Sequence, residues 1–171
     1  FRRFGETFDT GMHVIGGMQE GGNIRRICEY LGIFDKVHVM DVDPDVIDTL
    51  YFAEDKKVYK IAQGKEGFVN ALSESFPDQT DNLRAYVDAV YAIVDELDMF
   101  YLRPSQDFIF VHSEDFMMSV DGFIAKYISD MKLCSVLAYM NPLYGGRANM
   151  TPAYIHALIS EGGAGNFTPW R

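Results

Sequence analysis

The sequence predicts an α+β fold in which a small mixed or antiparallel sheet is followed by several helices. Two observations predict this class. Short segments with the alternating pattern of strands are concentrated in residues 7–62, whereas helical periodicity dominates from residue 65 onwards. The 171 residues contain no repeat, low-complexity tract or linker, so residues 1–171 are expected to form a single domain.

The first strand is expected over residues 7–15. It contains Gly11, and a glycine inside a strand is typical of a bulge or of a close approach by a ligand or another backbone. Two glycine pairs then predict a flexible turn over residues 16–22. Residues 23–31 follow as a short helix, because their apolar positions share one helical face and Gly32 can end it.

The remaining strands are expected before residue 63. Residues 36–42 alternate like a strand until Pro44, and residues 48–53 and 57–62 predict a hairpin. An acidic cluster surrounds the proline and consists of Asp41, Asp43, Asp45 and Asp48. Because the glycine and the terminal glutamate of an EF-hand loop are missing, this cluster favours a solvated turn over a calcium site.

Five further helices are expected after the hairpin. Their ranges are 65–76, 80–101, 119–128, 130–140 and 151–163. The expected N-caps are Thr80, Ser119 and either Ser129 or Asp130. The pair at 141–142, Asn-Pro, is expected to end the fourth helix, and the pair at 151–152, Thr-Pro, to begin the fifth.

The composition excludes some functions. A formal net charge of −10 argues against a nucleic-acid partner, because such a protein repels phosphate backbones. Cys28 and Cys134 lie far apart among apolar helical residues, so they are expected to be buried and reduced, which favours a reducing compartment. No cysteine or histidine spacing suits a metal ion, and His38, His112 and His156 are expected in structural or solvated roles.

The aromatic and methionine content leaves two interpretations open. The 13 Phe, 10 Tyr and 9 Met suit a large apolar cavity, but ordinary core packing is the favoured interpretation, because these side chains fill irregular cores. The segments that would wall such a cavity are the Met- and aromatic-rich helices over 116–140 and the Tyr-Gly-Gly sequence at 144–146.

One segment carries a family resemblance. Residues 8–16, Phe-Asp-Thr-Gly-Met-His-Val-Ile-Gly, resemble the FD-T-G-x-H-x-x-G stretch of the phytoene desaturase / carotenoid isomerase / retinol saturase family of FAD-dependent oxidoreductases. Residues 21–32 look like the helix that follows in the retinol saturase branch. The likeness continues at residues 43–45, 52, 119–137, 143–146 and 151–152. It therefore covers nearly the whole chain.

This resemblance implies that the chain is the substrate-binding domain of a two-domain flavoprotein. The FAD-binding Rossmann segments are expected before residue 1 and after residue 171, so the chain is expected to be a fragment of a larger protein. Its own glycines lack the G-x-G-x-x-G spacing of a dinucleotide-binding turn. The parent protein is expected to use FAD, with NAD(P) as a second candidate cofactor, whereas this chain is expected to bind little or no flavin.

The resemblance also implies site residues. The cofactor side is assigned to Asp9, Thr10 and Gly11. The substrate side is assigned to Met12, His13 and Tyr144. In a regular strand Asp9, Gly11 and His13 share one face, which places a carboxylate and an imidazole beside bare backbone that a flat ring can approach. The alternative is an aspartate bonded to backbone N–H groups and a histidine in a polar core contact.

The implied activity is hydride transfer at the flavin to or from an apolar polyene or isoprenoid-like substrate, as in a desaturase, an isomerase or a retinol saturase-like enzyme. The parent protein is expected in the cytoplasm or at a membrane surface. The isolated chain is expected to be inactive and to self-associate through apolar surface that the flavin domain would cover. The alternative is a stand-alone module that binds an apolar ligand or a partner protein without redox chemistry.

Overall fold

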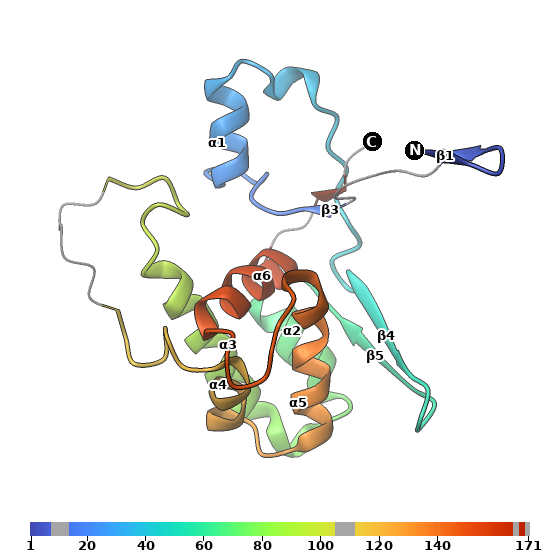
Figure 1. Cartoon of the computed structure of the whole chain (residues 1–171), viewed down its shortest axis with the longest axis vertical. Helices are drawn as coiled ribbons and strands as arrows, with labels where there is room; N and C mark the ends of the chain where they lie inside the picture. Colours follow the sequence, from blue (N-terminus) through green and yellow to red (C-terminus); the bar gives the residue numbers. More distant parts are fainter. Residues whose placement is uncertain (8–13, 105–111, 166–167, 170–171) are drawn as a thin grey trace.

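A computed structural model of the chain describes residues 1–7, 14–104, 112–165 and 168–169 (Figure 1). The helices are α1 (Asn23–Tyr30), α2 (Gly64–Ser73), α3 (Thr80–Asp95), α4 (Val120–Tyr127), α5 (Met131–Leu137) and α6 (Ala153–Gly165), with 3₁₀ helices η1 (Phe34–Lys36), η2 (Pro77–Gln79) and η3 (Ala138–Tyr144). The strands are β1 (Arg2–Arg3), β2 (Glu6–Thr7), β3 (Val14–Ile15), β4 (Asp48–Phe52), β5 (Lys57–Ile61) and β6 (Thr168–Pro169). The strands form antiparallel pairs, so the predicted α+β class is confirmed.

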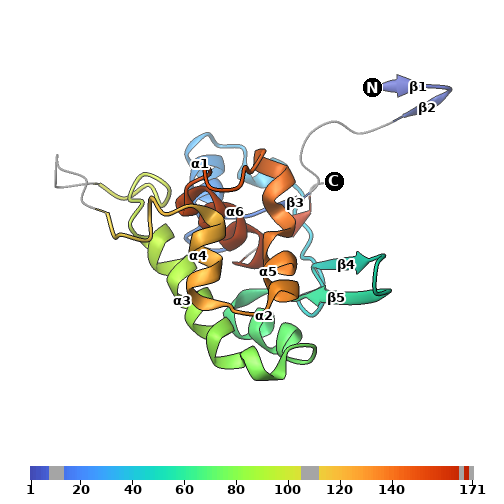
Figure 2. The same cartoon turned by 60° about the horizontal axis from the view of Figure 1, so that its bottom comes forward.

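The core lies among the helices that follow the hairpin. Figures 1 and 2 show α2 to α6 grouped into one body with the β4–β5 hairpin at its side, and Figure 1 shows α1 outside this group. Helix α3 is central, because it contacts α2, α4 and α6. Its buried residues, spaced by three or four positions, are Leu83, Tyr86, Val87, Val90, Ile93 and Val94. The predicted periodicity of this segment is therefore the periodicity of its core-facing side.

The predicted hairpin is confirmed. Strands β4 and β5 pair in register, with Leu50 opposite Tyr59, and Tyr59 and Ile61 are buried toward the helices. The turn is tied to α5 by an ion pair of 2.9 Å between the Lys132 ammonium and the Asp55 carboxylate. The hairpin thus packs as one side of the helical core.

The strand predicted over 36–42 is wrong. The 3₁₀ helix η1 ends at Lys36, and the chain then runs in an extended but irregular path with one bridging residue, Val39. Val37 and Val39 are half-buried, whereas His38 and Met40 are exposed. Burial therefore alternates along this segment as predicted. The alternation comes from an extended backbone with one side facing the protein, and this does not require a hydrogen-bonded partner strand.

Of the strand predicted over 7–15, only the ends lie within the described residues. Thr7 belongs to β2, which pairs with β1, and β3 pairs with β6. Asp9, Thr10, Gly11, Met12 and His13 lie outside the described residues. The predicted shared face of Asp9, Gly11 and His13 therefore stays a prediction.

The predicted N-caps Ser119 and Asp130 are confirmed, whereas Thr80 does not cap its helix. The Ser119 hydroxyl accepts a bond of 3.3 Å from the Gly122 N–H, and one Asp130 carboxylate oxygen accepts bonds of 2.8 and 2.9 Å from the N–H groups of Lys132 and Leu133. Thr80 is instead the first residue of α3, and its hydroxyl donates to the Pro77 carbonyl.

Several predicted helix ends are displaced. Helix α2 ends at Ser73, before the predicted residue 76, and α6 begins at Ala153 and runs to Gly165 rather than 163. The pair at 141–142 does not stop the fourth helix. The α-helical part ends at Leu137, and the chain continues as η3 through Pro142 until Gly145, which adopts a left-handed φ of 64°. Proline suits this stretch because its fixed φ is close to that of a 3₁₀ turn.

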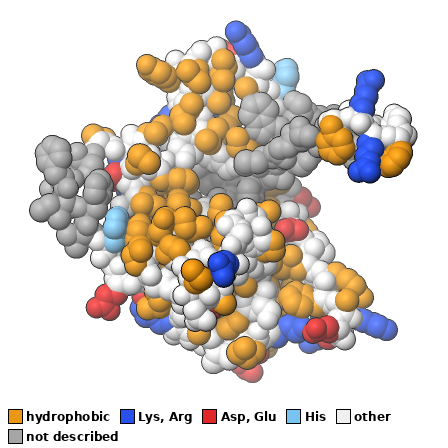
Figure 3. All heavy atoms as spheres, in the orientation of Figure 1, with side chains coloured by type: hydrophobic (Ala, Val, Ile, Leu, Met, Phe, Trp, Pro, Cys, Tyr) orange, Lys and Arg blue, Asp and Glu red, His pale blue; other side chains and the backbone are white. Residues whose placement is uncertain are grey.

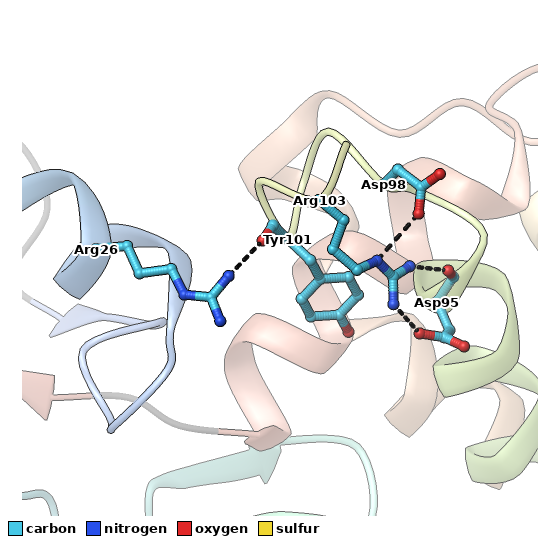
Figure 4. Close-up of polar contacts among 5 residues, drawn as sticks. All are labelled: Arg26, Asp95, Asp98, Tyr101 and Arg103. Carbon is cyan, nitrogen blue, oxygen red and sulfur yellow. Dashed lines mark hydrogen bonds and ion pairs between the residues drawn. The ribbon is translucent and has the colours of Figure 1, made fainter. Parts of the chain in front are cut away.

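Helix α3 ends at Asp95, not near residue 101, because a cationic side chain from the next turn takes its last carbonyl (Figure 4). Arg103 Nη2 donates to the carbonyl of Asp95, and Nη1 lies 2.7 Å from the Asp95 carboxylate. Its Nε lies 3.0 Å from Asp98 Oδ1. Because Arg103 binds this carbonyl and two carboxylates, its guanidinium takes the place of the backbone N–H that would continue the helix, and the chain turns back after α3.

The same turn holds the amino-terminal helix against the helical body. Arg26 Nη1 donates to the Tyr101 carbonyl at 3.1 Å (Figure 4). Asn23 Nδ2 donates to the Phe100 carbonyl at 2.9 Å. The glycine-rich turn before α1 allows this approach, since a Cβ on Gly22 would lie 2.2 Å from the Gly17 carbonyl oxygen. The predicted helix over 23–31 is thereby confirmed and anchored through its first turn.

Candidate functional site

An apolar groove of about 430 Å³ lies between α4 and α5. Its lining residues are Val120, Asp121, Ile124, Ala125, Met131, Cys134, Ser135, Ala138, Asn141, Gly146, Arg147, Ala148 and Thr151. The volume lies within the range of small-molecule sites in proteins. Residues of the predicted wall over 116–140 line this groove, but Met131 is the one Met or aromatic side chain among the lining residues, and Phe116 and Phe123 pack in the core instead.

Side-chain size along the two helices explains why space remains between them. Phe123 on α4 and Leu133 on α5 are fully buried in the core, and their bulk points away from the groove. The positions that face the groove include Ala125 and Ala138, which have small side chains and leave the space unfilled. Larger apolar side chains, Val120, Ile124 and Met131, also line the groove, so the small residues account for the open space and the larger ones for its apolar wall.

The loop at one side of the groove is held by its own hydrogen bonds. The Asp121 carboxylate accepts from the Asn149 N–H at 2.7 Å, and the Thr151 hydroxyl accepts from the Arg147 N–H at 2.8 Å. The Thr151 carbonyl accepts from the Val120 N–H at 2.9 Å. This loop is therefore built onto the first turn of α4, and the groove has a defined rim.

The two cysteines are free thiols in different surroundings. Cys28 is buried in α1, and Cys134 is half-buried in the groove wall, where its thiol lies 3.5 Å from the Ile128 carbonyl. Burial raises the pKa of the Cys134 thiol above its usual value. The predicted burial is confirmed for Cys28 and holds in part for Cys134, whereas their reduced state stays a prediction; the neutral Cys134 side chain adds to the apolar wall.

A buried hydrogen-bonded network lies behind the groove. His156 is fully buried in α6, with Nε2 2.7 Å from the Tyr86 hydroxyl and Nδ1 3.0 Å from the Tyr144 hydroxyl. The Tyr144 hydroxyl also donates to Asn141 Oδ1, and Ser160 Oγ lies 3.4 Å from His156 Nε2. Of these residues Asn141 lines the groove, so the network runs from the groove wall into the core.

Tyr144, predicted at the substrate side, does not line the groove. Its side chain is half-buried, burial raises its pKa to about 12, and its hydroxyl is engaged by Asn141 and His156. Sequence reasoning assigned His156 a structural or solvated role, and its burial fits a structural role. The signal that marks its position is the Ala153–His156–Ala157 spacing, which puts a histidine on the buried stripe of α6.

The other histidines lie elsewhere. His38 is exposed, and His112 Nδ1 lies 3.1 Å from the Glu96 carboxylate while its ring stacks on Phe116 at 3.8 Å. Across the residues that the structure describes, no three His, Cys, Asp or Glu side chains form a group that suits a metal ion. In the acidic cluster, Asp43 accepts from the Asp45 N–H, as in a solvated turn.

The glycine-rich turn before α1 does not fit a flavin pyrophosphate. Such a group needs free backbone N–H groups at a helix N-terminus. Here the Ile24 N–H donates to Asn23 Oδ1 at 2.7 Å, and the Arg25 N–H donates to the Gly17 carbonyl at 2.9 Å. The N–H groups of Ile24 and Arg25 are therefore already used inside the chain, and these bonds fold the turn onto the start of α1.

Apolar side chains are also exposed on α1 and just after it. The exposed fractions are 90% for Tyr30, 59% for Leu31, 40% for Ile27 and 37% for Ile33. Figure 3 shows hydrophobic side chains gathered on this upper part of the surface. This surface agrees with the predicted self-association of the isolated chain, which stays a prediction. In the described part of the chain, no helix has the length and apolar character that crossing a membrane requires.

The buried histidine predicts a pH-dependent stability. Burial lowers the pKa of His156 to about 4, whereas an unfolded histidine titrates near pH 6.5. Between these values the unfolded chain binds a proton that the folded chain excludes, so the contribution is present above about pH 6.5 and is lost toward pH 4. The expected loss at pH 5 is about 2 kcal/mol relative to pH 7. Urea unfolding at the two pH values measures it.

Two variants isolate this effect from the titration of carboxylates. His156→Gln is expected to reduce the pH dependence of the unfolding free energy by about 2 kcal/mol, whereas His38→Gln, at an exposed position, keeps the wild-type dependence. An H156Q protein with an unchanged difference between pH 7 and pH 5 contradicts the prediction.

Comparison with known proteins gives distant relatives over most of the chain. The human all-trans-retinol 13,14-reductase is 25% identical over 175 residues, which covers 93% of this chain and 28% of the relative. The prolycopene isomerase of Arabidopsis thaliana chloroplasts is 23% identical over 150 residues, covering 80% of this chain and 25% of the relative. An Oncidium prolycopene isomerase is 23% identical and covers 85% of this chain.

The chain thus spans between 22% and 29% of the length of the curated relatives that it matches. No family model matches it, and no solved structure matches it.

Proposed function

We propose that this chain forms the substrate-binding part of an oxidoreductase that acts on an apolar polyene or isoprenoid-like molecule. The chain is similar over most of its length to proteins of the phytoene desaturase / carotenoid isomerase / retinol saturase-like family. The observation that carries this proposal is the apolar groove between α4 and α5. A polyene offers few polar groups, so a site for it depends on apolar area and shape. A groove walled by Val120, Ile124 and Met131 supplies both.

The relatives support the enzyme class. Their names describe a reductase of all-trans-retinol and isomerases of prolycopene. All-trans-retinol and prolycopene are elongated apolar molecules with conjugated double bonds. We therefore propose that the parent protein carries out redox chemistry on such a molecule, with hydride transfer at FAD and with NAD(P) as a second candidate cofactor. This chain contributes binding and exclusion of water, because the chemistry belongs to the cofactor.

The FAD-binding Rossmann segments are proposed to lie outside residues 1–171. Two observations support this arrangement: the relatives are more than three times as long as this chain, and the one described glycine-rich turn at a helix start has its first donors occupied. Asp9, Thr10 and Gly11 are proposed to line the flavin, with Met12 and His13 toward the substrate. Tyr144 is proposed to act on the substrate side through Asn141.

The test compares this chain with the longer protein that contains it. The longer protein is expected to purify with a yellow cofactor whose absorption is that of oxidised flavin, whereas residues 1–171 alone are expected to bind little or none. A flavin spectrum in the isolated chain contradicts the proposed division of labour. A longer protein that stays colourless after addition of FAD favours the alternative, a module that binds an apolar ligand without redox chemistry.

A further inference from the structure

The hydrogen bonds behind the groove have a defined direction. A tyrosine hydroxyl carries one proton, and that of Tyr144 is donated to Asn141 Oδ1. The contact of 3.0 Å between Tyr144 and His156 Nδ1 is then a bond from the ring N–H to the tyrosine oxygen. The unprotonated Nε2 consequently accepts from the Tyr86 hydroxyl at 2.7 Å. Each donor in the series Tyr86, His156, Tyr144 points toward the groove.

The series ends on an amide whose carbonyl is already engaged. Asn141 lines the groove, and its side chain lies against Gly146, where an added Cβ would be 3.1 Å from Asn141 Cβ. The backbone carbonyl of Asn141 accepts from the Gly146 N–H at 2.9 Å, which fixes the residue on η3. With Oδ1 held by Tyr144, the amide has one orientation, and its remaining polar group is the NH₂.

We infer that the Asn141 NH₂ group faces the groove as a fixed donor and selects an elongated apolar ligand that carries a neutral oxygen acceptor, a carbonyl or a hydroxyl, at one end. This inference rests on the proposed function, and it adds a specificity-determining residue. Asn141 is half-buried, and a ligand in the groove would cover its amide. A covered donor that meets an acceptor gains a hydrogen bond, whereas a hydrocarbon end leaves it desolvated and unpaired. Tyr144 and His156 are positioning residues that hold the amide.

The charges at the rim do not alter this choice. Asp121 and Arg147 both line the groove and carry opposite charges; the Asp121 carboxylate is engaged by the Asn149 N–H, and Arg147 is exposed to solvent. A net charge of −10 on the chain disfavours an anionic ligand. The groove therefore fits a neutral acceptor better than a carboxylate.

The experiment measures binding of three ligands to the complete chain by calorimetry: geranylacetone, which is an acceptor-only ketone, and the hydrocarbon and the carboxylate of the same carbon skeleton. The ketone is expected to bind about tenfold more tightly than the hydrocarbon. Ketone binding is also expected to move the Asn141 side-chain NH₂ resonances in an NMR spectrum of the asparagine-labelled protein.

Two variants separate the donor from the fold. Asn141→Asp keeps an oxygen acceptor for Tyr144 but removes the NH₂, so the preference for the ketone is expected to disappear while hydrocarbon binding persists. Asn141→Leu is expected to remove the preference and to lower stability as well, because it leaves the Tyr144 hydroxyl without its acceptor. NMR of the His156 ring nitrogens is expected to show the proton on Nδ1.

Four results overturn the inference. They are equal binding of ketone and hydrocarbon, tighter binding of the carboxylate, an N141D protein that keeps the ketone preference, and a His156 proton on Nε2. In each of these cases binding of apolar ligands still supports the proposed function. Failure of all three ligands to bind overturns both proposals.

Discussion

Replacement of Phe123 by alanine is expected to lower the free energy of unfolding by about 3 to 5 kcal/mol. The side chain is fully buried, and its ring lies 5.8 Å from that of Tyr86 on α3 and 5.5 Å from that of Tyr127, measured between centroids. Its removal leaves a cavity between α4 and the central helix, which the surrounding side chains fill only in part. Urea unfolding followed by circular dichroism measures the change.

A matched control uses an exposed apolar residue. Leu143 is 72% exposed on η3, so Leu143→Ala is expected to change the unfolding free energy by less than about 0.5 kcal/mol. A loss below about 1 kcal/mol in F123A, with an unchanged slope against urea, shows that α4 does not pack on α3 as described here.

The position of Phe123 links stability to the site. Helix α4 presents Phe123 to the core and Ala125 to the groove, and Ile124 contributes to both, so a helix that packs in the core also forms one wall of the groove. A packed wall keeps its shape because interiors are dense and resist deformation. This arrangement explains how an open groove retains a defined width between two short helices.

Local signals in the sequence predicted much of the fold. Ser119 and Asp130 cap their helices because a cap needs only its own side chain and the next few N–H groups. The β4–β5 hairpin followed from alternation on both sides of a short turn. These features depend on residues within a few positions of one another, so they can be predicted from the sequence before any tertiary contact is known.

Features set by distant or competing contacts were not predictable in the same way. The end of α3 depends on Arg103, eight residues beyond Asp95, whose guanidinium takes the last helical carbonyl. The network through His156 joins Tyr86 and Tyr144, which are 70 and 12 residues away in the sequence. The sequence indicated segments that line the groove, but the role that we infer for Asn141 follows only from the direction of these bonds.

Filling the groove is expected to weaken ligand binding about 30-fold while the stability of the fold stays nearly unchanged. Ala125 is exposed and lines the groove, so a phenyl group at this position in Ala125→Phe occupies the space that an apolar ligand needs. Overpacking a formed site costs about 2 kcal/mol, which corresponds to an affinity lower by about 30-fold. Because Ala125 does not belong to the core, the unfolding free energy is expected to stay within about 0.5 kcal/mol.

The control carries the same substitution on another exposed helical surface. Ala92 on α3 is exposed and does not line the groove, so Ala92→Phe is expected to bind ligand like the wild type. Calorimetric titration with the hydrocarbon skeleton used above compares the three proteins. If A125F binds as tightly as A92F, the ligand sits elsewhere on the chain and the groove between α4 and α5 is not the substrate site. Weakened binding in A125F but not in A92F assigns the groove as the ligand site. This assignment rests on a steric effect and does not depend on Asn141.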